Sequence, residues 1–186
     1  MAVVNTLSTV ISNYDASPRI LTSGFLAGAN DTVTVATAAA AATDSIGSTY
    51  RYAFCPSGVR VEDIQIQNDA TTAGVWQLGV YANDQQPCRT VTAGVVSTAA
   101  PGALVVANSN LIFAVGVSTA AAQLTWKSIY APTVLAGANG AINVNKRVWE
   151  LLNLDLDPFY EFHMVLTATT APTAAGNITL QLTWVR

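Results

Sequence analysis

The sequence predicts an all-β fold, a jelly roll or another antiparallel β-sandwich, with one short helix near residues 145–153. Most patterned segments alternate apolar and polar residues with a period of two, as a strand with one buried face does. Turn segments rich in Gly, Pro, Asn and Ala separate them, and no strand–helix–strand rhythm is present. With 186 residues, a single domain with a sizeable core is expected.

The first part of the chain is the least patterned. Residues 1–18 show no strand or helix period before Pro18, so we interpret them as an N-terminal arm that precedes one sandwich domain, residues 19–186. Residues 19–26 and 31–35 are candidate strands. The next segment, ATAAAAA at residues 36–42, has helix propensity but is too short to stand alone as a helix.

Two strands are predicted next. In residues 49–54 one face carries three aromatic side chains, Tyr50, Tyr52 and Phe54. In residues 59–67 the apolar positions change parity at Glu62–Asp63, which predicts a β-bulge there.

The middle of the chain continues the strand pattern. Residues 75–81 align Trp76, Leu78 and Val80 on one face. Residues 111–117 are apolar on both faces, as a central strand of a sandwich would be. A short strand follows in which Leu124 and Trp126 alternate around Thr125.

The last two strands have the clearest alternation. They are predicted at residues 160–167 and 177–185, and the turn sequence TTAPTAAGN separates them. We interpret the pair as an antiparallel hairpin with one buried face and one face in water.

The short helix is expected just before these strands. Asn145 is the predicted N-cap of KRVWELLN, in which Val148, Leu151 and Leu152 share one face. Asp157–Pro158 ends the segment, since the residue before a proline resists the helical conformation. Two basic residues at the positive end of the helix dipole predict that the helix depends on packing. We interpret it as a lid over the open end of the sandwich rather than a binding site.

Charges are scarce. They make up 10% of residues, against about 25% in ordinary soluble proteins. No charged residue lies between Arg89 and Lys127, and His163 is the only ionisable side chain in residues 162–185. A surface of Thr, Ser, Asn, Gln and Ala is easily desolvated, which favours a protein covered by partners in an assembly. The alternative is a soluble sandwich whose surface relies on hydroxyl groups.

Composition also excludes several classes. A net charge of −3, a pI near 4.8 and the lack of any Lys/Arg cluster exclude a nucleic-acid partner. No signal peptide and no membrane-spanning run are predicted, so assembly in a cytoplasm is expected. Cys55 and Cys88 are predicted to be buried thiols rather than a disulfide.

The sequence predicts no catalytic, cofactor-binding or metal-binding residues, and therefore no enzyme. The nearest approach to a G-x-S-x-G nucleophile motif, Gly116 to Ala120, fails at its last position. One histidine excludes His-rich metal sets, and His163 is expected at the surface, on the polar face of its strand beside Glu161.

Carboxylate pairs and tryptophans offer little more. Glu62 and Asp63 straddle the predicted bulge, while Asp155 and Asp157 flank a turn where Asp commonly bonds the backbone. Among the four tryptophans, two align with aliphatic residues and are predicted in the core, Trp76 and Trp184. A sugar-stacking role stays open for Trp126 and Trp149.

The C-terminal segment has a recognisable order of features. A W-E-L-L-x-L segment, a D-P turn, an aromatic-led strand, an Ala/Thr/Gly turn and a terminal strand follow one another, with the residues Trp149, Glu150, Leu151, Leu152, Leu154, Asp157, Pro158, Tyr160, Gly176 and 178–185. This order resembles the ending of tailed-bacteriophage capsid cement (decoration) proteins. The chain departs from that pattern at Asn153, where a Gly is expected, and at Phe159 after the proline.

The resemblance implies a non-enzymatic virion protein on the capsid exterior. Such a protein binds the major capsid protein across capsomer junctions, stabilises the shell and needs no cofactor. We also expect self-association, as a dimer or trimer, and an arm that orders on a neighbouring subunit. The alternatives are a carbohydrate-binding sandwich module and a tail or baseplate component of a virion.

Overall fold

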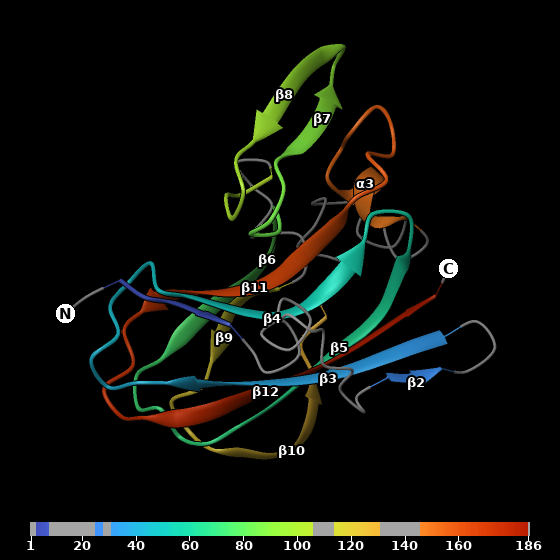
Figure 1. Ribbon diagram of the computed structural model, residues 1–186. Helices are drawn as coiled ribbons and strands as arrows, with labels where there is room; N and C mark the ends of the chain where they lie inside the picture. The colour runs from blue at the N-terminus through green and yellow to red at the C-terminus, as the bar shows by residue number, and fades with distance from the viewer. Residues whose placement is uncertain (1–2, 8–24, 28–30, 106–113, 131–145, 186) are drawn as a thin grey trace, which may run out of the picture.

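A computed structural model describes residues 3–7, 25–27, 31–105, 114–130 and 146–185, and it contains two five-stranded sheets and one two-stranded sheet. The first sheet has the order β1-β4-β11-β6-β9, made of Asn5–Leu7, Thr49–Pro56, Glu161–Thr170, Val75–Tyr81 and Ala114–Ser118. The second sheet has the order β10-β5-β12-β3-β2, made of Gln123–Ser128, Arg60–Asn68, Gly176–Val185, Asp31–Ala40 and Phe25–Ala27. The two sheets form the layers of a sandwich (Figure 1), which confirms the predicted all-β class.

The chain winds between the two layers. From β3 onward each strand lies in the sheet opposite its predecessor, except that β6 and β9 share the first sheet and the hairpin β7–β8 lies between them in sequence. All pairings are antiparallel apart from β1 with β4.

The hairpin predicted for the last two strands is wrong. β11 pairs with β4 and β6 in the first sheet, whereas β12 pairs with β3 and β5 in the second. Alternation marks the inward face of a strand but does not say which strand lies beside it. The segment TTAPTAAGN therefore carries the chain across the sandwich instead of closing a hairpin.

The core lies between the sheets and is centred on aromatic side chains. Trp76 is fully buried, and its ring meets Tyr50 edge-on with 5.0 Å between centroids. Its indole nitrogen donates to the Thr119 hydroxyl at 2.7 Å, so the polar edge of the ring is satisfied. Trp76 and Trp184 are both buried in the core, as predicted.

Two bulges change the parity of strands. The pairing of β12 with β5 runs from Thr183–Asp63 to Trp184–Val61, so Glu62 is the extra residue, which confirms the predicted bulge. A second bulge falls in β4, where Met164 pairs with Ala53 and Val165 with Arg51. It turns Phe54 away from the face of Tyr50 and Tyr52, and the prediction that the three share a face is wrong.

The start of the chain adds strands at both sheet edges. β3 continues through Ala40, because every second residue of its later part is an alanine that is buried against the core: Ala36, Ala38 and Ala40. β1, within the predicted arm, pairs in parallel with β4. Residues 8–24 lie outside the described residues, so the domain boundary after Pro18 and the strand expected at residues 19–24 stay predictions.

The helix α3, Val148–Leu151, is shorter than predicted and depends on packing. The N-cap is Arg147, whose N–H donates to the Glu150 carboxylate at 2.6 Å, so the prediction of Asn145 as N-cap is wrong. The N–H groups of Val148 and Trp149 donate to the carbonyls of Val59 and Ser57, at 2.9 and 3.1 Å. This places the helix against the turn between β4 and β5, with Val148 buried.

A Schellman motif ends the helix. The N–H of Asn153 donates to the carbonyl of Glu150, and the N–H of Leu154 to that of Trp149. Asn153 has φ 56, in the left-handed region that Gly favours and Asn tolerates. The departure from the cement-protein pattern at this position therefore preserves the backbone conformation.

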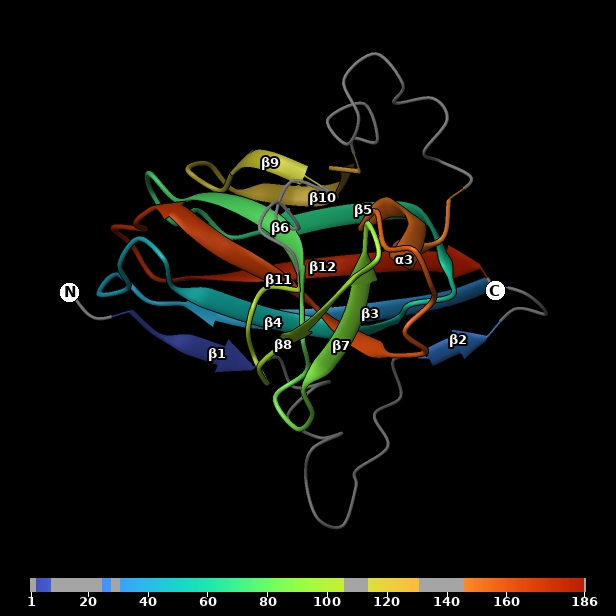
Figure 2. The same ribbon diagram turned by 90° about the horizontal axis from the view of Figure 1, so that it is seen from above.

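The hairpin of β7 (Cys88–Thr92) and β8 (Val95–Ala99) projects from the sandwich on the side of the first sheet (Figures 1 and 2). No strand was predicted at these residues. The two strands are joined by the pair Ala93–Gly94. Both residues have positive φ, 50 and 74, as a two-residue hairpin turn requires, and the glycine is the part of this turn that the sequence shows.

Candidate interface

Part of the outer face of the first sheet, around Arg51 and His163, is covered by the chain itself. Arg51 of β4 and His163 of β11 point away from the core, yet both are buried. The covering segment contains Ala82 and Gly102, whose carbonyls accept hydrogen bonds from the Arg51 guanidinium at 3.2 and 2.7 Å. Arg51 thus fastens this segment to the sheet.

His163 is part of this buried cluster, and its predicted surface position is wrong. Nη1 of Arg51 lies 2.9 Å from Nδ1 of His163 and 3.2 Å from Oδ1 of Asp84. Because a guanidinium only donates, Nδ1 accepts, and the ring is neutral with its proton on Nε2. Burial, and then the charge of Arg51, lower the pKa of His163 to about 3.

The outer face of the second sheet is open. Its outward side chains on β3 and β12 are exposed or half-buried and carry no charge: Val35, Thr37, Ala39, Thr179, Gln181 and Thr183. Gln65, Gln67 and Asp63 of β5 continue the same rows, since Gln181 pairs with both Val35 and Gln65. We call this surface the open face.

Polar groups on the open face are largely paired within the chain. The hydroxyls of Thr37 and Thr179 lie 2.9 Å apart across two strands. The amide of Gln67 donates to the Leu124 carbonyl at 2.7 Å. Asp63 accepts from its neighbours Ile64 and Gln65 and from Ser128. Covering this face with a partner therefore leaves few groups without hydrogen bonds.

The strand β10 forms one edge of the open face. Its pairing with β5 skips from Gln123 to Lys127, so residues 124–126 bulge outward, and Leu124 is 73% exposed and Trp126 40% exposed. Trp149 is different, because it is half-buried and packs against the core from within α3. The two tryptophans that were candidates for stacking a sugar therefore differ in exposure, and only Trp126 is open to a ligand.

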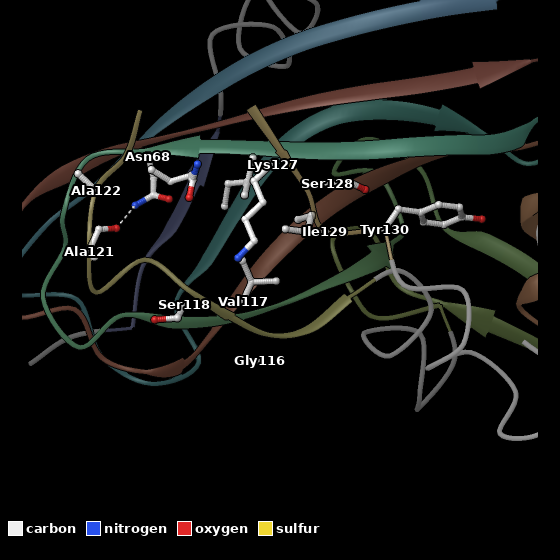
Figure 3. A pocket seen from close by; sticks show the side chains of 12 residues that line it. Asn68, Gly116, Val117, Ser118, Ala121, Ala122, Lys127, Ser128, Ile129 and Tyr130 are labelled. Atoms are coloured by element: carbon white, nitrogen blue, oxygen red, sulfur yellow. Dashed lines mark hydrogen bonds between the residues drawn. The ribbon is translucent and has the colours of Figure 1, made fainter. Parts of the chain in front are cut away.

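A pocket of about 510 Å³ opens where β9 and β10 leave the sandwich edge unpaired (Figure 3). Lys127 reaches across it toward Val117, and its wall includes Ser118 and Tyr130. It holds no pair of acid and base groups. Among the described residues, no three His, Cys, Asp or Glu side chains gather as a metal site would require.

The projecting hairpin is a second exposed surface, and Arg89 of β7 is its one charged side chain. Asp155 anchors it, because its N–H donates to the Val91 carbonyl at 2.8 Å and its carboxylate accepts from the Gly94 N–H at 2.7 Å. Val95 is 66% and Val96 51% exposed. The hairpin thus presents apolar side chains at the end of the molecule that carries the helix.

Substituting Ala93 with asparagine is expected to stabilise this hairpin by roughly 1 kcal/mol, because Asn tolerates the left-handed conformation that disfavours Ala. The protection of the β7–β8 amides against hydrogen exchange should rise accordingly. Ala93→Val is the matched opposite change and should lower that protection. Equal protection in both variants would contradict the turn geometry.

Three of the carboxylates weighed as catalytic candidates have structural partners, whereas Glu62 is the exposed extra residue of the bulge in β5. Asp157 accepts from the Ser57 hydroxyl at 2.5 Å and from the Phe159 N–H at 2.8 Å. Asp155 holds the hairpin and Asp63 holds the start of β5. Phe159, which follows the proline, is 92% exposed with φ 50.

The two cysteines are buried thiols, as predicted. Burial raises the pKa of Cys55 to about 12 and that of Cys88 to about 11, so both remain protonated near neutral pH. Among the described residues, no helix is long and apolar enough to cross a membrane.

Comparisons with known proteins identify no family for this chain. No family model matches the chain, and no curated protein does. Among solved structures it is similar to a chain of the "Cyanophage Pam1 capsid asymmetric unit", with 12% identity over 92% of this chain and 96% of that chain. The TM-score of 0.37 is too low for this similarity to support a function.

Proposed function

We propose that this chain is a non-enzymatic structural protein of a bacteriophage virion, a cement or decoration protein that binds the outer surface of the capsid. The observation that carries the proposal is a sandwich with two exposed surfaces that carry few charges, Asp63 on the open face and Arg89 on the hairpin. The C-terminal resemblance to cement proteins points the same way.

The strand order supports a jelly roll as the finer description of the fold. Taking β3, β4, β5, β6, β9, β10, β11 and β12 as strands one to eight, the sheets read 1-8-3-6 and 2-7-4-5. Such a winding of two Greek keys occurs in viral capsid and lectin domains. Because one fold hosts many functions, the role rests on the surfaces rather than on the winding.

A cement protein works by adding interface. Each copy would bind the major capsid protein across capsomer junctions on the capsid exterior after synthesis in the host cytoplasm. Neutral polar surfaces pack with bridging water and without unpaired charge. Repetition of many copies lets weak single contacts hold by avidity. Self-association as a dimer or trimer belongs to the same proposal.

Co-sedimentation of the purified protein with capsid shells stripped of it, expanded and unexpanded, tests this function. Saturable binding to expanded shells, together with better survival of those shells on heating, is the expected result. Sedimentation velocity of the free protein reports whether it self-associates. Absence of binding to both shell forms would refute the cement role, and a glycan screen would then test the carbohydrate-binding alternative.

A further inference from the structure

We propose that the open face of the second sheet is the surface that docks on the capsid, and that it fits a broad, uncharged, polar protein surface. This inference rests on the proposed function and names the contact it uses. The hairpin, which lies on the side of the first sheet, remains outside this contact.

The two outer faces of the sandwich point to this assignment. The outer face of the first sheet is partly covered by the chain around Ala82 and Gly102, which Arg51 holds in a buried cluster, and the hairpin projects from that side. In Figure 1, no element among the described residues lies beyond β3, β12 and β10 on the far side of the second sheet. Among the described residues, nothing projects from that side, as docking on a broad surface requires.

The size of the open face is adequate. The ten residues of β12 extend about 33 Å, and four strands about 4.8 Å apart span about 19 Å with their side chains. The projected area of about 600 Å² approaches the ~800 Å² per partner of a stable interface. The hairpin is only two strands of five residues, so it offers far less area on either face.

Its chemistry selects a neutral partner. Gln181 lies at the centre, between Val35 and Gln65 in the same row, and the next row is Thr37, Thr179 and Gln67. The paired hydroxyls and amides lower the cost of losing water. A charge placed at the centre of this face would be desolvated without a partner in the bound state, which strongly opposes docking.

The test is shell co-sedimentation with Gln181→Glu and Thr37→Lys, which put charges of opposite sign on the open face. Each is expected to bind at least about 100-fold more weakly than the natural chain. Gln85→Glu is the matched control, because it makes the same chemical change at an exposed position on the side of the first sheet, and it should bind normally. Val96→Glu tests the hairpin and should also bind normally.

The outcomes separate the inference from the function it rests on. Binding of both open-face variants with unchanged affinity would overturn the inference while leaving the cement role intact. So would a loss of binding confined to Val96→Glu. Failure of the natural chain to bind would instead refute the cement role itself. Thermal unfolding of each variant checks that it is folded, and Thr37 is used because its side chain is exposed and the one hydrogen bond that its replacement removes, to Thr179, is also exposed.

A second copy of the chain is the remaining occupant of this face. If the natural protein sediments as an oligomer and Gln181→Glu converts it to monomers, the open face is a contact between copies, and the inference is wrong. Unchanged oligomeric state in Gln181→Glu, together with its weaker shell binding, supports the inference.

Discussion

Replacing the buried Arg51 with methionine is expected to lower the free energy of unfolding by about 3–5 kcal/mol. The carbonyls of Ala82 and Gly102 would lose their donor, and Asp84 would lose the cation 3.2 Å away. Unsatisfied buried acceptors are costly because water cannot replace the lost partner. Since a whole domain has about 5–15 kcal/mol of stability, this one substitution removes much of it.

Denaturant unfolding followed by tryptophan fluorescence measures this effect. Asp84→Asn is the control: Asp84 is 27% exposed and keeps an acceptor oxygen, so the loss should be much smaller. Hydrogen exchange should show that the amides of the covering segment lose protection first in Arg51→Met. A loss below about 1 kcal/mol would mean that the cluster does not fasten this segment.

The sequence predicted where the strands lie along the chain better than it predicted which strands pair. Burial of one face imposes alternation, so the strand around Trp76 and the bulge at Glu62 were readable from the chain alone. Pairing partners were not, because alternation is the same whether β11 and β12 form a hairpin or lie in opposite sheets. The extra residue in β4 left no signal, because the aromatic series Tyr50, Tyr52 and Phe54 alternates without a break.

Burial of the outer face of β11 was also invisible. Arg51 and His163 lie 112 residues apart, and their meeting depends on a covering segment that is distant from both in sequence. A polar residue on the outward side of a strand normally faces water, so His163 was placed at the surface. Only the sheet order and the covering segment together make that position interior.

The sequence predicted an uncharged partner surface but did not predict which residues form it. The uncharged residues 162–185 suggested a partner surface, yet β11 and β12 are central strands, and their lack of charge mostly reflects burial. On β12 the outward side chains Thr179, Gln181 and Thr183 remain half-buried rather than buried. The uncharged stretch after Arg89 is different, because it includes the exposed hairpin and β10.

His163 should make the stability of the fold depend on pH. Burial and Arg51 hold its pKa in the folded protein at about 3, below the value of 6.5 for an unfolded chain. Between these values the unfolded chain binds the extra proton, so stability rises with pH in this window. The contribution is complete above about pH 6.5 and is lost progressively as the pH falls toward 3.

Between pH 7 and pH 5 this linkage is expected to remove about 2 kcal/mol from the free energy of unfolding. His163→Gln is the matched variant, because its amide oxygen accepts from Arg51 in place of Nδ1 but takes up no proton. Both proteins share all carboxylates, so the difference between their denaturant midpoints at each pH isolates the histidine. Parallel stability curves from pH 7 to pH 5 would show that His163 takes up a proton within the folded protein, and that the cluster is open to water.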